Sequence, residues 1–279
     1  MEGENIPADA EGNNPQVNPA LTVTLISPSL DQLSQSIDRV KDQHCGSHSQ
    51  TLRKSYLLAK NLDNKTFSRL WEDADLFSGV TATLWATQRC VLYRIMPNLQ
   101  HEMIRTAFMT ILTDSLREMN LRSINGDFCE IGRSRIHGNS TSKESDYGFC
   151  PISVLTLIPG DKPAPSLVLE VGVSESHAQL IQDVYWWNAN PPIRPGFVVL
   201  IYVKKNPVYR MDIEVWEEIE HQSDRRLSQH LYVEGGIVHG GPLRLDFGLL
   251  MRRPPNPSIE RDIVFTDYQI LFLAKQTEL

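Results

Sequence analysis

The segments PSLVLEVGVSESHAQLIQDVYWWN (165–188) and FVVLIYVKK (197–205) decide the fold of this chain. The first begins with SLVLEVGV, a short run rich in β-branched residues that favours a strand. Leu180, Val184 and Trp187 then recur on one face at helical spacing, which predicts a helix. FVVLIYV is apolar on both faces and is typical of a central buried strand. A strand, a helix and a strand in this order predict a right-handed crossover between two parallel strands.

The rest of the chain supplies further strands and helices around this unit. Alternation of Tyr209, Met211, Ile213 and Val215 with charged residues predicts a strand with one solvated face. The other expected elements are helices at 29–40 and 99–119, weaker helices at 52–62 and 67–76, strands at 81–96, 127–136 and 145–152, β-rich sequence at 230–250, and a final helix at 266–275. We therefore expect an α/β (α+β) protein, with a mixed central β-sheet flanked by helices and an N-terminal helical extension.

Changes in composition and in hydrophobic periodicity along the chain predict four segments. They are a disordered acidic tail at 1–26, a helical extension at 27–80, the sheet core at 81–219, and a β-rich C-terminal extension ending in a helix at 220–279. The tail is rich in Asn, Pro and Gly, shows no periodicity, and has no Lys or Arg among its acidic residues. These features predict a segment that does not pack on the core.

Composition excludes several classes of protein. Of the 279 residues, 41% are hydrophobic and 22% are charged, which is enough for a packed core and excludes wholesale disorder. No apolar run reaches the ~20 residues of a membrane-spanning helix, and the acidic N-terminus does not resemble a signal sequence. We therefore expect an intracellular protein of the cytoplasm or nucleus without a membrane partner.

The net charge of -7 excludes a protein that coats nucleic acid with a broadly basic surface, but it is compatible with a local basic groove. The four cysteines show no metal-ligand spacing.

Two acidic residues in apolar surroundings are the strongest candidates for chemistry. Glu170 lies in the middle of the strand SLVLEVGV, on the same face as Val168 and Gly172. Asp146 lies in SDYGF, on the strand expected to precede it. A buried carboxylate must be paired, protonated or bound to a metal. Two of them on adjacent strands would suit one Mg²⁺ or Mn²⁺ ion, which takes oxygen ligands and can activate a bound water.

A structural role is the competing interpretation of Glu170. A glutamate within a strand often pairs with a nearby arginine, and Arg133 or Arg135 could supply that partner. On the residues alone, both interpretations stay open.

Motifs around the two acids resemble those of the restriction-endonuclease-like PD-(D/E)XK nuclease superfamily. The similarity runs through SKESDYGFCP (142–151), then EVGVSES and the downstream WW, then FVVLIYVKK and MDIEVWE (211–217). Within the superfamily, the chain looks most like a group of mainly fungal members that share an EVGxSES element. The resemblance covers about residues 90–219, roughly half of the chain. It implies a restriction-endonuclease-like fold and metal-dependent hydrolysis of DNA.

The resemblance also implies which residues carry the chemistry. Asp146 and Glu170 would be ligands of a Mg²⁺ or Mn²⁺ ion, and the backbone carbonyl of Val171 would be the third ligand from the protein. Glu102, from the first core helix, is a looser fourth candidate.

The chain departs from the superfamily at the position two residues after the glutamate. A lysine is usual there, and it would orient the attacking water and stabilise developing negative charge. Here the residue is Gly172, which can do neither. Lys143 or Gln179 could take over the role. A solvated loop lysine and a capping box of Ser176 with Gln179 are the ordinary alternatives.

Two main functions follow from the sequence. One is a metal-dependent nuclease that acts on DNA, with Asp146, Glu170, Lys143 and Gln179 as catalytic residues. The other is a catalytically inactive module for binding nucleic acid or protein on the same fold, which Gly172 and the acidic balance favour. A docking partner in a larger complex is a third alternative. The sequence does not predict an oligomeric state.

Overall fold

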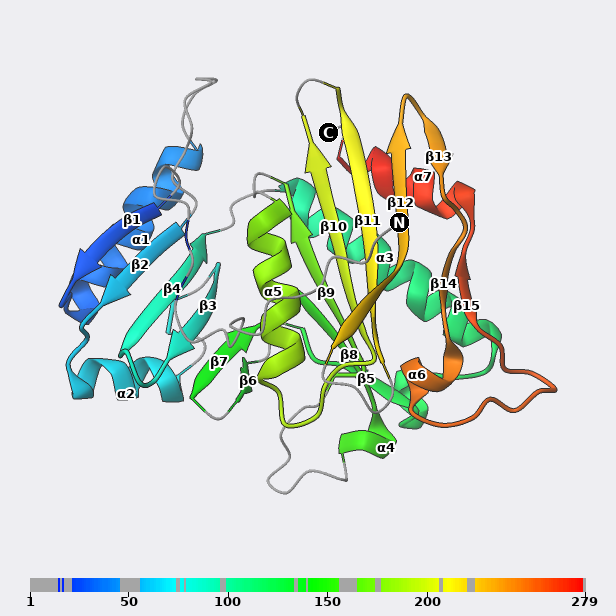
Figure 1. The fold of residues 1–279 in the computed structure, drawn as a ribbon, viewed down its shortest axis with the longest axis horizontal. Coiled ribbons are helices and arrows are strands. Elements are labelled where there is room, and N and C mark those ends of the chain that lie inside the picture. The colour runs from blue at the N-terminus through cyan, green and yellow to red at the C-terminus, as the bar shows by residue number, and fades with distance from the viewer. Residues whose placement is uncertain are drawn as a thin grey trace.

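The computed structural model describes most of the chain. The described residues are 15, 17, 22–45, 56–73, 76–77, 79–95, 99–132, 135–138, 140–155, 165–173, 177–205, 208–219 and 224–277. Two β-sheets stand side by side in the molecule, with helices packed on both (Figure 1). The predicted disorder of the tail lies outside the described residues, except that residues 22–26 form a strand.

The smaller sheet comes from the first half of the chain and has the strand order β1-β2-β4-β3-β7-β6. Its strands are β1 (Thr22–Ile26), β2 (Tyr56–Lys60), β3 (Val80–Trp85), β4 (Cys90–Ile95), β6 (Arg135–His137) and β7 (Thr141–Glu144). Helices α1 (Leu30–Cys45) and α2 (Asn64–Glu72) cover one face, where Leu33, Ile37 and Phe67 pack on alternate residues of the strands. The opposite face of β4 presents Cys90, Leu92 and Arg94, because side chains alternate along a strand.

The larger sheet has the order β13-β12-β11-β10-β9-β8-β5 and is mixed. Its strands are β5 (Phe128–Glu130), β8 (Tyr147–Pro151), β9 (Leu167–Gly172), β10 (Phe197–Lys204), β11 (Arg210–Glu218), β12 (Arg225–Glu234) and β13 (Ile237–His239). Strands β9 and β10 run parallel, and the other neighbours are antiparallel. This arrangement confirms the predicted class of a mixed central β-sheet flanked by helices.

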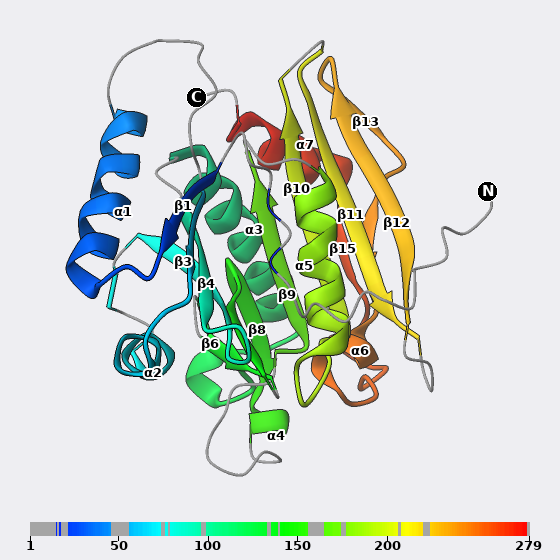
Figure 2. The ribbon, with the colours of Figure 1, turned by 60° about the vertical axis from the view of Figure 1, so that its left-hand side comes forward.

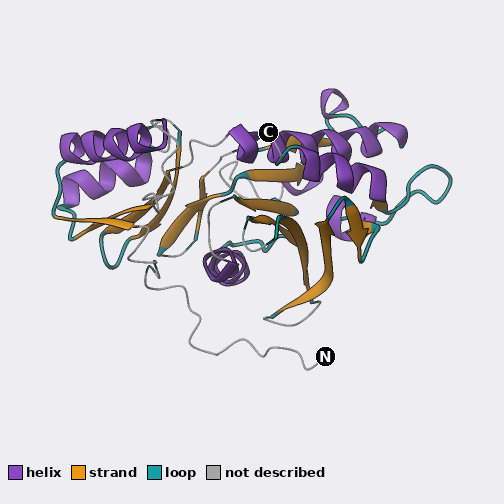
Figure 3. Ribbon diagram, turned by 90° about the horizontal axis from the view of Figure 1, so that it is seen from above, coloured by secondary structure: helices purple, strands orange, loops and turns teal. Residues whose placement is uncertain are grey.

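Helices cover both faces of the larger sheet, as the view from above shows (Figure 3). On one face, α3 (Leu99–Glu118) and α7 (Asp267–Lys275) bury the main core with residues such as Phe108 and Leu273. On the other face, α5 (His177–Ala189) places Leu180, Val184 and Trp187 on β9 and β10 (Figure 2). Short elements complete the chain: η2 (Ser123–Asn125), α4 (Ile152–Leu155), α6 (Phe247–Met251) and a two-stranded sheet of β14 (Leu243–Leu245) with β15 (Ile263–Phe265).

The strand–helix–strand unit that decides the fold is confirmed. Strands β9 and β10 are parallel neighbours, with Glu170 opposite Leu200, and α5 connects them. Strand β10 lies in the middle of the seven strands, and all but its last residue are buried. Its apolar sequence on both faces follows from helices above and below it.

The divisions of the first hundred residues need correction. Residues 27–80 are not purely helical, because β2 replaces the helix predicted at 52–62. Tyr56, Leu57 and Leu58 are all buried in that strand, so packing overrides a weak local preference. The single strand predicted at 81–96 is the hairpin of β3 and β4, whose four-residue turn contains no Gly or Pro. Both strands belong to the smaller sheet rather than to the core.

The C-terminal segment is rich in strands and ends in the helix α7, and its strands β12 and β13 add to the larger sheet. One prediction about the C-terminal half changes. Strand β11 lacks the predicted solvated face, because Asp212 and Glu214 are both buried. Arg210 and His230 contact Asp212, and Tyr202 donates to Glu214 at 3.0 Å, so paired side chains cover these acids. No helix among the described residues is long and apolar enough to span a membrane.

The central position of β10 predicts that an isoleucine-to-alanine substitution there costs more stability than the same substitution on an edge strand. Ile201→Ala should destabilise the protein by about 2–5 kcal/mol, because Ile201 is fully buried in the main core. Ile237→Ala on the edge strand β13 should change stability by less than about 0.5 kcal/mol, since Ile237 is 60% exposed. Urea unfolding of both variants measures the difference, and equal losses would contradict the assigned core.

Candidate functional site

Asp146 and Glu170 converge on one cation, and that cation is the side chain of Arg94. The Nη2 atom of Arg94 donates to Oδ1 of Asp146 in a short contact and to Oε2 of Glu170 at 3.1 Å. Both carboxylates are fully buried, and Arg94 is 6% exposed. The two predicted acids are therefore adjacent, but they are not in a crevice open to solvent.

The second oxygen of Asp146 has two further partners. The backbone N–H of Val171 donates to Oδ2 at 2.8 Å, and Nε2 of His101 lies 3.0 Å from the same oxygen. His101 is 2% exposed and comes from the first turn of α3. Both oxygens of Asp146 are thus held by positive or N–H groups.

Glu170 is held just as completely. Its Oε1 atom accepts a hydrogen bond of 2.8 Å from the indole N–H of Trp187 and lies 3.6 Å from Nζ of Lys143. Lys143 also donates to Oδ1 of Asp183 at 2.8 Å, and Nη1 of Arg94 lies 3.7 Å from the other oxygen of Asp183. The site is a closed charge cluster of three acids (Asp146, Glu170 and Asp183) with Arg94, Lys143 and His101.

Burial and charge together set the protonation of this cluster. Burial alone would raise the pKa of Asp146, but the charges of Arg94 and His101 and the Val171 N–H hold it well below its usual range. Burial likewise opposes charge on His101, yet Asp146 raises the pKa of His101 to about 9. Burial would lower the pKa of Lys143, but Asp183 and Glu170 raise it. Asp146 is therefore ionised, and His101 and Lys143 are protonated near neutral pH.

Glu170 behaves differently from Asp146. Burial raises the pKa of Glu170 to about 7, and the charges of Asp183 and Asp146 act in the same direction, while Lys143 and Arg94 oppose them. The charge of Glu170 is thus less firmly held by its surroundings than that of Asp146.

Strands of both sheets, helices α3 and α5 and the link between β7 and β8 bring the cluster together. Strand β4 of the smaller sheet supplies Arg94, and Thr81 on β3 accepts from its Nε at 3.2 Å. Lys143 lies on β7, and Asp146 follows where the chain leaves the smaller sheet to begin β8 of the larger one. Glu170 comes from β9, and Asp183 and Trp187 come from α5. The cluster is therefore the electrostatic contact between the two sheets.

The arrangement does not fit the divalent metal that the resemblance implies. The described residues include no group of three or more His, Cys, Asp or Glu side chains placed to hold a metal ion. Nη2 of Arg94 contacts one oxygen of each acid, which is the place that a shared cation would take. A guanidinium and a metal ion cannot occupy that place together.

The structure places the remaining predicted residues as follows. Lys143 is buried rather than a solvated loop lysine, because the strand β7 carries it into the cluster. Gln179 lies in the first turn of α5, on the helical face of Asp183 and Trp187. Its predicted capping partner, Ser176, lies outside the described residues. Val171 reaches Asp146 through its N–H, and the predicted metal role of its carbonyl stays a prediction.

The structural interpretation of Glu170 holds with a different arginine. Arg135 pairs with Glu144, because its Nε donates a hydrogen bond of 3.0 Å to Oε1 of Glu144. Arg133 lies outside the described residues. Glu102 pairs with Arg105, and its Oε1 lies 3.5 Å from Nδ1 of His101.

Arg94, His101 and Asp183 were not identified from the sequence. Arg94 is the only charged residue of the strand CVLYRI, just as Glu170 is the only charged residue of LVLEVG. A lone charge in an apolar strand needs a partner, so this pattern could have indicated Arg94. His101 shares a buried helical stripe with Ile104 and Phe108. Asp183 had no comparable signal, since a charge on an amphipathic helix is ordinary.

Comparison with known proteins gives little further information on this site. No protein-family model matches the chain, and no curated protein does. Among solved structures, the chain is similar to one described as "a putative nuclease belonging to DUF820" from Anabaena variabilis, with 9% sequence identity and a TM-score of 0.44. The match covers 69% of this chain and 90% of that one. A likeness of this size does not bear on the activity of the chain.

Arg94 should be the most costly charged residue of the cluster to remove. Arg94→Leu should destabilise the protein by about 3–5 kcal/mol, because it leaves two buried carboxylates without their shared cation. Arg117→Leu is the matched control, since Arg117 pairs with Asp114 on the surface and such pairs contribute about 0–1 kcal/mol. Chemical unfolding measures both. A loss for Arg94→Leu as small as that of the control would show that the cluster does not hold the sheets.

His101 should make stability depend on alkaline pH. Its pKa is about 9 in the folded chain and about 6.5 in an unfolded one. Its contribution is therefore complete below pH 6.5 and is lost as the pH rises through 9. We expect the unfolding free energy of the wild type to fall more between pH 6 and 9.5 than that of His101→Gln. Parallel pH profiles for the two proteins would rule out a protonated His101.

Proposed function

We propose that this chain is a non-hydrolytic binding module on a nuclease-like fold, in which Arg94 takes the place of a catalytic divalent cation. The observation that carries the proposal is the guanidinium shared by Asp146 and Glu170. Three chemical features of the cluster support it.

The first feature is the nature of the cation. A guanidinium neutralises two carboxylates, but it has no coordination position for a water molecule. It therefore cannot lower the pKa of an attacking water or act as a Lewis acid on a phosphate. With Arg94 in place, the charges of the acids are neutralised, but no group activates a water molecule as the nucleophile.

The second feature is the missing lysine. Gly172 stands where a lysine would point to the same face as Glu170, and it offers no group to orient water. The third feature is burial, since a phosphodiester would have to reach carboxylates that are fully covered. Both features oppose hydrolysis independently of the metal.

Metal-dependent hydrolysis of DNA is the second candidate, and Lys143 favours it. Its Nζ lies 3.6 Å from Glu170, although it comes from β7 rather than from β9. A lysine at this place could serve the role that Gly172 cannot. That function requires Arg94 to leave the acids and Mg²⁺ or Mn²⁺ to replace it.

A metal titration separates the two candidates. Wild-type protein should show no saturable binding of Mn²⁺ or Mg²⁺ by calorimetry and no metal-dependent rise in melting temperature, since Arg94 already satisfies both acids. Glu170→Gln provides the comparison, because it removes one carboxylate charge at nearly constant volume. Saturable Mn²⁺ binding by the wild type that Glu170→Gln abolishes would overturn the proposal.

A cleavage assay gives an independent readout. Single- and double-stranded DNA incubated with wild type, Asp146→Asn or Glu170→Gln should be cut no faster than by buffer with Mg²⁺ or Mn²⁺. Cutting by the wild type alone would establish the nuclease instead. DNA binding at low salt, where phosphate contacts are strongest, should survive both substitutions if nucleic acid is the partner of the module. Loss of all DNA binding would leave a protein as its partner.

A further inference from the structure

Two cysteines face each other across neighbouring strands at the edge of the larger sheet. Strand β5 ends that sheet and pairs with β8 in antiparallel orientation (Figure 1). Cys129 lies opposite Cys150 in their register, and both residues carry thiols in the structure. Facing positions on paired strands are the positions where two side chains meet most directly.

The backbone around the cysteine pair fixes the distance between its two members. The N–H of Ile131 donates to the carbonyl of Gly148 at 2.9 Å, and the N–H of Ile152 donates to the carbonyl of Asp127 at 3.2 Å. These hydrogen-bonded pairs flank the cysteines on either side in the register, so the cysteines occupy a hydrogen-bonded position as well. The Cα atoms of such a pair lie about 5.5 Å apart, and disulfides mostly join Cα atoms about 4.4–6.8 Å apart.

The two thiols differ in how far solvent can reach them. Cys150 is fully buried, whereas Cys129 is half-buried on the edge strand, next to the exposed Glu130. Burial raises the pKa of the Cys129 thiol, and its hydrogen bond with Cys150 opposes that effect. A small oxidant can therefore reach Cys129 from the edge of the sheet, with the thiol of Cys150 beside it on the next strand.

We propose that Cys129 and Cys150 are an oxidation site, at which a small disulfide converts the two thiols into a reversible disulfide bond. The thiolate of Cys129 attacks one sulfur of the oxidant and expels the other half as a thiolate, which leaves a mixed disulfide on Cys129. The thiolate of Cys150 then attacks the sulfur of Cys129 and expels the remaining half. The two cysteines lose two protons and two electrons, and the oxidant is reduced to two thiols. This inference does not depend on the function proposed for the cluster around Arg94.

The same geometry makes the bond easy to reduce. Facing Cβ atoms on paired strands lie about 4.5–5.5 Å apart, whereas a disulfide holds them about 3.5–4.5 Å apart. The two strands must therefore move together to close the bond. Strained disulfides are the labile ones, so we expect the oxidised and reduced forms to interconvert.

The position of the pair along the chain gives the bond a structural effect. The chain leaves the larger sheet after β5, forms β6 and β7 of the smaller sheet, and returns in β8. A bond between Cys129 and Cys150 would close this excursion into a loop that contains Lys143 and Asp146 of the charge cluster. Closing a loop restricts the unfolded chain, so the oxidised protein should be the more stable form.

Peptide mapping of the full chain in glutathione buffers tests the site. Native protein is incubated at rising ratios of oxidised to reduced glutathione, and the remaining thiols are alkylated. Trypsin then cuts after Arg135 and Lys143, which separates the two cysteines unless they are bonded. A peptide pair linked through Cys129 and Cys150 should accumulate as the ratio rises, faster at about pH 8.5 than at pH 7 because the thiolate reacts, and excess reduced glutathione should remove it. Thiols left unlinked at the highest ratio, or held only as mixed disulfides with glutathione, would overturn the proposal.

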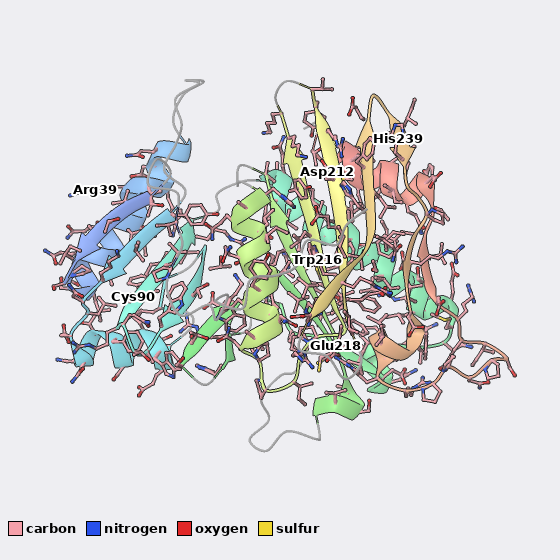
Figure 4. All side chains as sticks on the ribbon, in the orientation of Figure 1. Arg39, Cys90, Asp212, Trp216, Glu218 and His239 are labelled. Carbon is pink, nitrogen blue, oxygen red and sulfur yellow. The ribbon has the colours of Figure 1, made fainter. Side chains whose placement is uncertain are left out.

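Controls decide whether the fold selects this pair. Cys45→Ser, at the end of α1, should leave the linked peptides unchanged, and Cys129→Ser should abolish them. Cys90 lies in the smaller sheet, away from the pair (Figure 4), and should keep its thiol throughout. Oxidation of the chain in urea should instead give mixed pairings of the four cysteines. The same mixture from the native protein would show that the fold does not select the pair, and would overturn the site.

Melting curves test the structural effect. The oxidised wild type should melt about 5 °C above the reduced protein, because the bond restricts the unfolded chain. Cys45→Ser should show the same shift, and Cys129→Ser should melt at one temperature in both buffers. An equal or lower melting temperature for the oxidised wild type would overturn the proposed effect on stability.

Discussion

One guanidinium shared by two buried carboxylates is the contact on which the arrangement of this molecule depends. Arg94 belongs to the smaller sheet, whereas Glu170 belongs to the larger one and Asp146 lies between them. Charges without water must be paired to be tolerated. The two sheets therefore have to keep the relative position that brings these groups together, and His101, Lys143 and Trp187 hold the acids from the remaining directions.

The same pairing is a physical reason not to infer the function of this chain from its fold. The acids lie on neighbouring elements of a mixed sheet, and a fold alone does not decide what such a pair does. Their four oxygens, however, contact Arg94, His101, Lys143, Trp187 and a backbone N–H. Function follows the chemistry of those contacts rather than the topology of the sheet.

Sequence reasoning succeeded where a local pattern and the tertiary environment agree. The apolar run of β10, the stripe of α5 and the isolated charge of Glu170 each follow from burial in the larger sheet. It failed where distant segments decide the outcome. Strand β2 depends on packing against β1 and β4, and the partner of Glu170 comes from a strand 76 residues earlier in the chain. No spacing rule connects Arg94 to Glu170, although each is a lone charge in an apolar strand.

The passage of the chain from β7 to β8 has a consequence for how the protein unfolds. Only Ser145 and Asp146 separate a strand of the smaller sheet from a strand of the larger one. Pulling the sheets apart would strain this two-residue connection and expose Asp146 at once. The two sheets are therefore coupled covalently at Asp146 as well as electrostatically through Arg94, and we expect the cluster to open when they separate.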